Sequence, residues 1–275
     1  MENLPSHVKR EKHFLLQEKV DLVISDISPV PFAAANQANI TSVGISNFTW
    51  FTAYTQMLDE KKLEPLYRAY SYMDYFVSLA GGITEPRWGR RGYSQTGFFC
   101  RTPHDEEVNR LKAQFNPENA KIIVFFAVGM SIYVDDLKQM AMWNDDSCLF
   151  IVSNNMNADG DNIIRIPEHV TESQDYLAVC DIVITKPGWG TVSEAISLGK
   201  PLLLLERSSF LEDRNTVEAL TELHPYRLME WQELKHLQIT RGLITSIKNN
   251  RPNRSLKNKG EPLQEIVNFI RHLVN

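Results

Sequence analysis

The sequence predicts an α/β protein with two regions, each a parallel sheet wrapped by helices. Three observations predict this fold. Short apolar or β-branched strand patterns alternate with helical patterns along most of the chain, which favours parallel sheets. A stretch over 81–115, rich in Gly, Pro and Arg and then charged, separates two such runs. The length of 275 residues, 43% of them hydrophobic, is enough to bury two cores.

The amino-terminal region is expected to hold three strands that alternate with helices. A charged amphipathic helix is expected over 7–19, followed by a strand over 21–25 and a helix over 31–38. The pattern then predicts a strand over 42–46, one helix over 52–68 and a strand over 74–79. We therefore expect a first domain over 1–100, with a linker that runs to about residue 118.

The carboxyl-terminal region, 119–275, is expected to form the second domain. Its first strand is expected over 121–127, and Gly129-Met130-Ser131 follows as a turn into a helix. Further strands are expected over 148–152, 163–166, 181–185 and 202–205. The last helix is a candidate to pack back on the amino-terminal domain.

The most informative segment is 180–206, CDIVITKPGWGTVSEAISLGKPLLLLE. A buried strand is broken at 186–188, and helical character follows over 191–198 until Gly199 and Pro201 end the helix. Backbone N–H groups at the start of such a helix point at the turn, where Gly188 and Gly190 have no Cβ to obstruct an anion. A diphosphate group fits this kind of turn.

Composition narrows the class of protein. The formal net charge of −5 argues against general binding to nucleic acid, which needs a concentrated basic face. Cys100, Cys148 and Cys180 lack metal-ligand spacing and are expected to be reduced structural thiols. The longest apolar run, 122–128, is far shorter than the roughly 20 residues that span a bilayer, and the first residues lack the apolar core of a secretory signal. We therefore expect a cytoplasmic protein.

Two stretches resemble a known family. ITKPGWGTVSEAISLGKP, 184–201, is similar to the strand, Gly-rich turn, Thr-x-x-Glu-Ala and Gly-x-Pro exit of the donor-binding domain of GT-B fold glycosyltransferases. DLVISDISPVPFAAANQANITSVGISNFTW, 21–50, resembles the acceptor-side domain of related bacterial enzymes. The resemblance covers nearly the whole chain. It points to the branch that includes the N-acetylglucosaminyltransferase of peptidoglycan lipid intermediates and the plant galactolipid synthases.

The resemblance implies two Rossmann-like domains, of which the amino-terminal one is incomplete. The family opens that domain with a strand and a Gly-rich loop that this chain does not match, so roughly 80 to 100 residues of an ordinary domain are expected to be missing. The chain is then expected to be a fragment, one half of a split enzyme or a catalytically impaired relative. A partner chain or a second copy of this chain is a candidate to cover the incomplete sheet.

By the same resemblance, the chain is expected to be a glycosyltransferase of the hexosyltransferase type, poorly active alone. It would move a sugar from a nucleoside-diphosphate donor, with a UDP-sugar expected, to an acceptor hydroxyl by inverting displacement, without a metal or cofactor. The acceptor stays open between a lipid, a glycan and a small molecule. One alternative is a non-catalytic or partner-completed module that binds nucleotide sugars. Another is an epimerase or hydrolase of nucleotide sugars on the same fold.

The turn at 186–191 and the helix after it hold most of the expected donor contacts. The resemblance assigns Glu194 to the ribose hydroxyls and the backbone near Thr191 to phosphate. The two residues also have the spacing of a capping box, which would satisfy N–H groups at the helix start without a ligand. Trp189 is expected either to line the sugar site or to cover the turn. Lys186 either offers a charge to phosphate or is solvated at the strand end.

Two further groups complete the expected donor site. Gly129 and Ser131 follow a buried strand and can supply more phosphate-facing donors, or form an ordinary turn. Arg207, Asp213 and Asn215 follow the last predicted strand, where relatives hold the hydroxyls of the transferred sugar. The competing interpretation for 212–213 is an acidic helix start stabilised by the helix dipole.

The acceptor-side candidates follow two strands of the first region. Asp26 and Ser28 come just after the strand over 21–25, on the edge where parallel sheets present ligand sites, although either can instead cap the next helix. Asp26 is the one weak candidate for a catalytic base. Asn47, Thr49 and Trp50 follow the next strand and predict a polar and aromatic acceptor wall, or a turn with a buried indole.

Two other signals are interpreted structurally. The string Asp159-Gly160-Asp161 lies among turn formers and predicts a loop, so no metal site is expected. Arg87, Arg90 and Arg91 lie beside Trp88, and this cluster predicts either weak contact with an anionic membrane surface or solvated charges in a linker.

Overall fold

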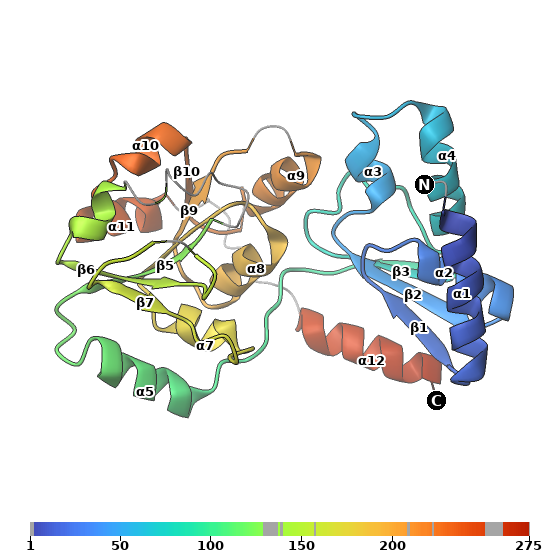
Figure 1. Cartoon of the computed structure of the whole chain (residues 1–275), viewed down its shortest axis with the longest axis horizontal. Helices are drawn as coiled ribbons and strands as arrows, with labels where there is room; N and C mark the ends of the chain where they lie inside the picture. The colour runs from blue at the N-terminus through green and yellow to red at the C-terminus, as the bar shows by residue number, and fades with distance from the viewer. Residues whose placement is uncertain are drawn as a thin grey trace. The chain divides into compact units, whose positions relative to one another are not determined.

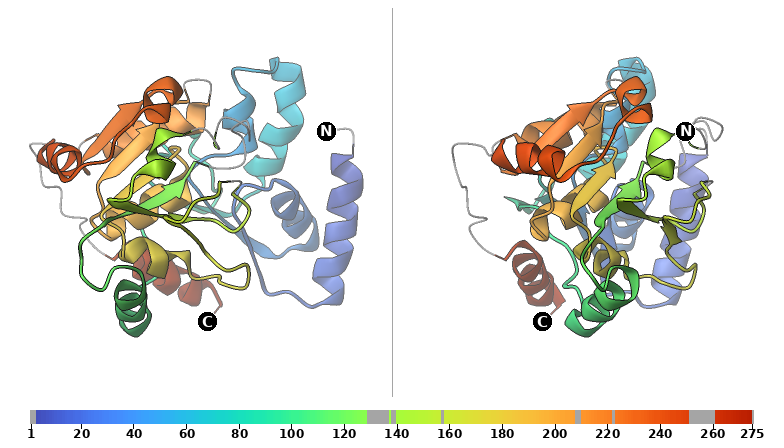
Figure 2. Two further views of the ribbon diagram at one scale, coloured as in Figure 1. Left: turned by 60° about the vertical axis from the view of Figure 1, so that its left-hand side comes forward. Right: turned by 90° about the vertical axis from the view of Figure 1, so that its left-hand side faces the viewer.

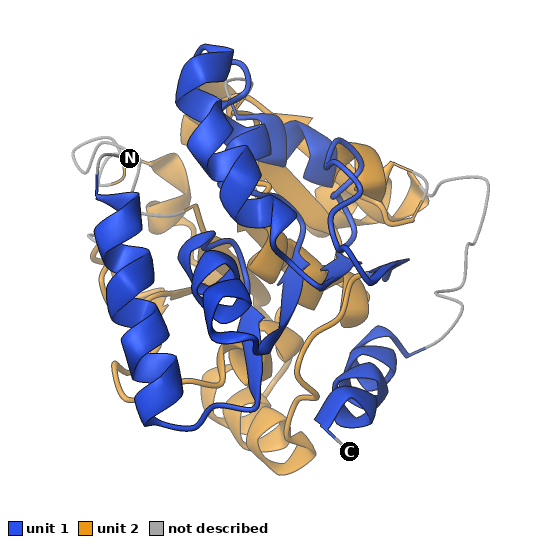
Figure 3. Cartoon of the chain, turned by 90° about the vertical axis from the view of Figure 1, so that its right-hand side faces the viewer, with its two compact units in different colours: residues 1–97, 210–216, 258–275 blue, residues 98–209, 217–257 orange. Residues whose placement is uncertain are grey.

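The chain folds into two compact units, shown in different colours in Figure 3. The computed structural model describes residues 3–128, 137, 140–156, 158–207, 210–221, 223–250 and 261–274. Unit 1 comprises residues 1–97, 210–216 and 258–275, and unit 2 comprises 98–209 and 217–257. Each unit is built around its own parallel sheet.

The sheet of unit 1 has the strand order β1-β2-β3-β4, and all its pairs are parallel. The strands are β1 (Leu22–Ser25), β2 (Thr41–Ser46), β3 (Tyr75–Ser78) and β4 (Gly92–Gln95). Helix α2 (Val30–Ala38) connects β1 to β2, and α3 (Trp50–Tyr54) with α4 (Glu60–Ser71) connects β2 to β3. Helix α1 (Leu4–Gln17) precedes β1 and packs on α2 (Figure 1).

The two faces of this sheet are covered differently. Val23 of β1 and Phe76 of β3 point to the face that α1, α2 and α4 cover, where they join two apolar clusters. Tyr75 and Val77 point to the opposite face because side chains alternate along a strand. That opposite face is covered by α12 (Pro262–Val274), the last helix of the chain (Figure 1).

The sheet of unit 2 has the order β10-β9-β8-β5-β6-β7 and is again parallel throughout. Its strands are β5 (Ile122–Ala127), β6 (Cys148–Val152), β7 (Ile163–Arg165), β8 (Ile182–Thr185), β9 (Leu202–Leu205) and β10 (Tyr226–Met229). Its helices are α5 (Asp105–Phe115), α7 (Ser173–Ala178), α8 (Trp189–Ser197), α10 (Trp231–Lys235) and α11 (Arg241–Asn249), with a 3₁₀ turn over Ala141–Asn144. Helix α9 (Leu211–Leu220) straddles the division between the units.

The core of unit 2 explains why its strands are continuous apolar runs. Every residue of β6, β8 and β9 is buried. Parallel strands covered by helices on both faces have no solvent side, so they lack the alternation of a half-exposed strand. Helices lie on both sides of this sheet (Figures 1 and 2). Each fully buried Ile, Leu or Phe contributes about 1.5 to 3 kcal/mol of transfer free energy.

The parallel α/β architecture confirms the fold predicted from the sequence, but three expected elements differ. The helix expected over 52–68 is two helices, because Thr49 caps α3 by accepting from Thr52 N–H and Asp59 caps α4 by accepting from Lys62 N–H. The stretch 81–115, expected to be a linker, contains β4 and α5. The helix expected over 191–198 begins earlier, at Trp189.

No helix within the described residues has the length and apolar character that a membrane span requires.

Candidate functional site

The turn between β8 and α8 lies at the carboxyl edge of the sheet of unit 2. Strand β8 ends at Thr185, and Gly188 is the N-cap of α8 in an extended conformation, with φ −74° and ψ 130°. The first intrahelical bond runs from Val192 N–H to the Gly188 carbonyl at 3.2 Å. The N–H groups of 189–191 therefore precede the helical ladder, as in any first turn. Such a turn concentrates positive dipole ends where anions bind.

The glycines of this turn are not required by the fold. Neither Gly188 nor Gly190 has a positive φ. A Cβ added to Gly190 would meet no atom within 4 Å, and one added to Gly188 would meet only the flexible Lys186 side chain, at 3.3 Å. Glycine in a helix costs about 0.5–1 kcal/mol relative to alanine. The exposed Gly190 thus leaves an open surface at a small cost in stability.

Glu194 lies one helical turn after Gly190. Its side chain is partly buried, and its Oε1 accepts a long hydrogen bond of 3.4 Å from the Ser173 hydroxyl. Burial raises the pKa of this carboxyl above its ordinary value, with partial compensation from Arg101 and Ser173. The capping-box alternative for Thr191 and Glu194 is wrong, because the helix starts at Trp189 and Thr191 already lies inside it. Glu194 therefore does not cap the start of α8.

A segment that the sequence predicted to be part of the linker makes hydrogen bonds and ring contacts with a second face of α8. We call residues 98–104 the strap. Phe99 N–H donates to Ser193 Oγ at 2.8 Å, and the Ser193 hydroxyl donates to the Phe99 carbonyl at 2.5 Å. The Trp189 ring lies 5.9 Å from Phe98 in a stacked arrangement and 5.2 Å from Phe99 edge-on. These contacts favour the interpretation that Trp189 covers the turn.

The strap is also fastened to the start of α7. Arg101 forms an ion pair with Glu172 at 3.0 Å and donates to the Thr171 carbonyl at 2.8 Å. The buried Asp175 accepts from His104 N–H at 2.8 Å and contacts His104 Nδ1 at 3.0 Å. This hydrogen bond and the negative charge of Asp175 raise the pKa of His104. No spacing signal could have found these pairs, because about 70 residues separate the partners in sequence.

The remaining donor candidates lie elsewhere or outside the described residues. Gly129 and Ser131 are outside them. Lys186 and Arg207 are partly buried and follow β8 and β9, respectively. Asp213 and Asn215 are buried in the part of α9 that belongs to unit 1.

There, the side-chain N–H of Asn215 donates to Thr84 Oγ1 at 2.7 Å. Glu212 and Asp213 are the acidic residues in the first turn of α9, as the helix-start interpretation expected. Asp213 and Asn215 thus belong to a different unit from Gly188, Gly190 and Glu194.

The acceptor-side candidates are at the carboxyl edge of the sheet of unit 1, with different roles. Asp26 and Ser28 are exposed after β1, and the Ser28 carbonyl accepts from Ser25 Oγ at 3.1 Å. The interpretation that Ser28 caps α2 is wrong, since the N-cap is Pro29. Asn47 is buried, and its Nδ2 has no hydrogen-bond partner within the described part of the chain.

Glu85 was missed by sequence reasoning and organises this edge. Its carboxylate accepts from Thr49 N–H and from the Thr49 hydroxyl, both at 2.8 Å, and from Trp88 Nε1 at 2.9 Å. Trp50 stacks on Tyr54 at 5.4 Å, and its backbone N–H donates to the Tyr70 hydroxyl at 3.0 Å. Thr49 and Trp50 therefore hold the loop after β2 in place.

The arginine cluster is engaged within unit 1. Arg87 lies over the Tyr93 ring and Arg91 over the Tyr75 ring, each at 5.2 Å. Arg90 donates to the side chains of Asn36 at 2.8 Å and Asp74 at 3.0 Å. These contacts are those of structural arginines, and membrane contact stays a prediction. Among the described residues, no group of three or more His, Cys, Asp or Glu side chains is arranged to hold a metal ion.

Comparison with known proteins adds one distant relative in sequence. No family model matches the chain. L-arabinokinase of Arabidopsis thaliana is 25% identical to the chain over 220 residues, which are 77% of this chain and 21% of that protein. The chain therefore spans about a fifth of the length of this curated relative.

The similarity to solved structures is broader but low in sequence identity. Staphylococcus aureus MnaA in a co-structure with UDP has a TM-score of 0.62 at 14% identity, over 100% of this chain and 81% of that chain. Arabidopsis thaliana UGT89C1 complexed with UDP has a TM-score of 0.61 at 12% identity, over 98% and 77%. The spinosyn forosaminyltransferase SpnP has a TM-score of 0.61 at 13% identity, over 98% and 80%. With its two parallel sheets and these neighbours, the chain has the GT-B fold of glycosyltransferases, one Rossmann-like unit around each sheet.

Proposed function

We propose that the chain binds a nucleoside-diphosphate sugar at the amino-terminal turn of α8 and transfers the sugar to an acceptor hydroxyl. One observation carries this proposal. The first turn of α8 presents N–H groups and the open Gly190 at the carboxyl edge of a parallel sheet, one turn before the partly buried Glu194. Two structures with the same fold contain UDP, which supports a uridine nucleotide as the ligand.

The spacing of the two residues suits a nucleotide. Residues four apart lie on the same face of a helix, and one turn rises about 5.4 Å along the axis. A diphosphate over Gly190 would accept from the N–H groups of the first turn, while a ribose one turn further would donate its hydroxyls to the Glu194 carboxylate. The ribose would replace the long Ser173 hydrogen bond to Glu194.

The chemistry we assign to this site is stabilisation of the leaving group. As the bond to the sugar breaks, negative charge grows on the departing diphosphate. N–H dipoles already aimed at that position stabilise the charge without rearrangement, and Lys186 adds a positive charge nearby. We therefore propose transfer without a metal ion. Inversion requires a base that removes the acceptor proton on the opposite side of the sugar, typically worth 10² to 10⁴ in rate. Asp26, exposed after β1, is our candidate.

A second candidate function is a module that binds nucleotide sugars without transferring them. The observation that favours it is the match to L-arabinokinase, in which the similar stretch is about a fifth of a much longer chain named for a different reaction. Such a module would use the α8 turn in the same way and would need no base.

Calorimetric titration of the full chain with UDP and several UDP-sugars, with ADP as the comparison, tests the binding step. We expect saturable UDP binding that Glu194→Ala weakens about tenfold or more, because a hydrogen bond to a charged group contributes about 1.5–3 kcal/mol. The exposed Glu218→Ala on α9 is the matched control and should bind normally. No binding of any uridine nucleotide would refute the proposal. Release of UDP only when an acceptor is present indicates transfer, whereas binding without release indicates the module.

A further inference from the structure

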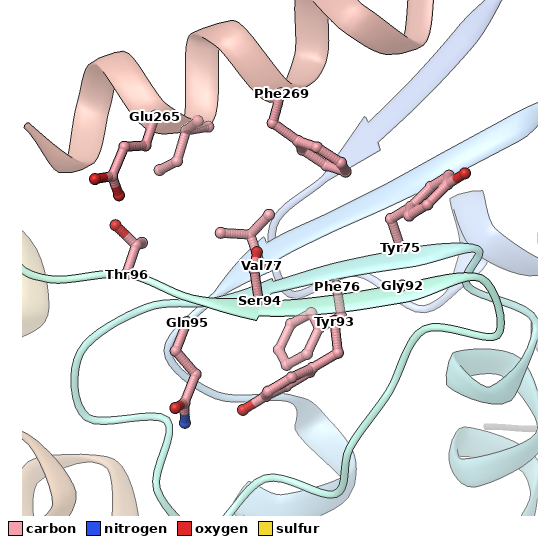
Figure 4. A pocket seen from close by; sticks show the side chains of 11 residues that line it. Tyr75, Phe76, Val77, Gly92, Tyr93, Ser94, Gln95, Thr96, Glu265 and Phe269 are labelled. Atoms are coloured by element: carbon pink, nitrogen blue, oxygen red, sulfur yellow. The ribbon is translucent and has the colours of Figure 1, made fainter.

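A small cavity lies in unit 1 between α12 and the face of the sheet that this helix covers. It has a volume of about 310 Å³ and is lined by β3, β4, Thr96 and α12 (Figure 4). This volume is at the lower end of the range of small-molecule sites. All the lining residues belong to unit 1, so the cavity is separate from the α8 turn of unit 2. The function proposed above does not use it.

One part of the cavity is apolar and aromatic. Tyr75 and Val77 of β3 point toward α12, and Phe269 points from α12 toward the sheet (Figure 4). The rings of Tyr75 and Phe269 lie 5.5 Å apart at an angle of 75°. Ile266 is the buried side chain of α12 and also lines the cavity. A flat or branched apolar group fits among these side chains.

The other part of the cavity is polar, and its one charged lining side chain is a carboxylate. The hydroxyl oxygen of Thr96 is buried and has no hydrogen-bond partner within the described part of the chain. Glu265 of α12 and Thr96 point toward one another across the cavity (Figure 4). The side chains that line the cavity include this carboxylate and no Lys, Arg or His. A buried polar atom without a partner is uncommon in folded proteins and calls for an occupant that can hydrogen-bond to it.

We propose that this cavity binds a small organic cation, an ammonium group carried on an aromatic or branched aliphatic body. The ammonium has three donors and no acceptor, so it can donate to Thr96 Oγ1 and pair with the Glu265 carboxylate. The body lies against the Tyr75 and Phe269 rings and the Val77 side chain. At this polar part an anionic group is disfavoured, because its charge would face the Glu265 carboxylate, whereas the Arg91 guanidinium lies over the Tyr75 ring of the apolar part.

Three molecules of similar shape separate charge from size: 2-phenylethylamine, 2-phenylethanol and 3-phenylpropanoate. Each is titrated into the full chain and followed by calorimetry or by NMR of the ligand. We expect the amine to bind about tenfold more tightly than the alcohol and the carboxylate to bind least. Glu265→Gln should make the amine and the alcohol equal, and Thr96→Val should weaken both. Glu261→Gln, an exposed glutamate just before α12, is the matched control and should keep the preference for the amine.

The proposal is overturned if the amine shows no saturable binding, if the carboxylate binds as tightly, or if Glu265→Gln leaves the preference unchanged. Glu265 is exposed and glutamine keeps its shape, so this variant is expected to fold normally, which circular dichroism checks. UDP titration of the same variants keeps the two proposals apart. Affinity for UDP should be unchanged in Glu265→Gln, whatever happens to the amine.

Discussion

Replacing Gly190 with alanine should move stability and donor affinity in opposite directions. Gly190 is exposed in the first turn of α8, and a Cβ added there would meet no atom within 4 Å beyond its chain neighbours and the backbone of its own helix. The added methyl group therefore strains nothing in the protein. It lowers the conformational entropy of the unfolded chain and favours the helix. The same methyl group occupies the space in which the proposed diphosphate approaches the backbone.

Both magnitudes follow from this geometry. The stability gain should be about 0.5–1 kcal/mol, which raises Tm by roughly 1–4 °C in a unit of this size. The affinity loss should equal at least one hydrogen bond to a charged group, about 1.5–3 kcal/mol, or about ten- to hundredfold in Kd. A purely structural glycine would give a loss of stability instead.

The chain offers a closely matched control. Gly242 is the second residue of α11, as Gly190 is of α8, and its nearest neighbour to an added Cβ is Thr240 Oγ1 at an ordinary 3.7 Å. Gly242→Ala should raise Tm to a similar extent and leave UDP binding unchanged. Thermal melting measures the change in Tm of the two variants, and calorimetric titration measures their affinity for UDP. If Gly190→Ala binds UDP as tightly as the unaltered chain, the turn is not the diphosphate site.

Three further predictions concern the contacts that position the two candidate sites. Ser193→Ala leaves the backbone groups of Phe99 without their partner, which should cost about 1–2 kcal/mol of stability and lower Tm by roughly 2–8 °C. The Kd for UDP should change less than threefold, and a larger change would contradict a role limited to supporting the turn. His104→Gln should flatten the dependence of Tm on pH. The hydrogen bond to Asp175 and its charge raise the pKa of His104, so the stability that the protonated His104 adds is complete below pH 6.5 and is lost as pH rises through the folded-state pKa. An unchanged slope of Tm between pH 6 and 8 would count against the His104–Asp175 pair. Glu85→Gln should destabilise unit 1 by about 1.5–3 kcal/mol in urea unfolding, since an amide cannot accept all three donors, whereas Glu64→Gln on the exposed face of α4 should not.

The parallel sheets could be predicted because their strands are buried on both faces. Such strands read as unbroken apolar runs, and β5, β6, β8 and β9 all do. Strand β4 carries no such signal. Its sequence, GYSQ, is partly exposed and polar, and it is a strand because it pairs with β3 at the edge of the sheet. An edge strand of this kind forms because the neighbouring strand has free backbone groups to pair with, and the local sequence does not reveal these groups.

The candidate site was predicted where its signal is local and was missed where it is not. The turn at Gly188 and Gly190 and the position of Glu194 follow from a single strand–turn–helix segment. Phe99 of the strap holds this segment through Ser193, and the strap is in turn held by Asp175 of α7 through His104. Their hydrogen bonds join residues that are 71 to 94 positions apart, and only tertiary packing brings them together.

The spacing of residues on α8 shows how the strap and a bound nucleotide sugar could contact the helix at the same time. Trp189 and Ser193 are four residues apart and share a helical face, and that face contacts the strap. Gly190 and Glu194 form the same spacing one residue later, so their face is rotated by about 100° from the first. A ligand on the second face can therefore be bound without displacing Phe98 or Phe99. The strap then serves as a fixed support for the backbone N–H groups. The leaving-group stabilisation that we propose requires such a support, because dipoles that must first reorient lose most of their effect.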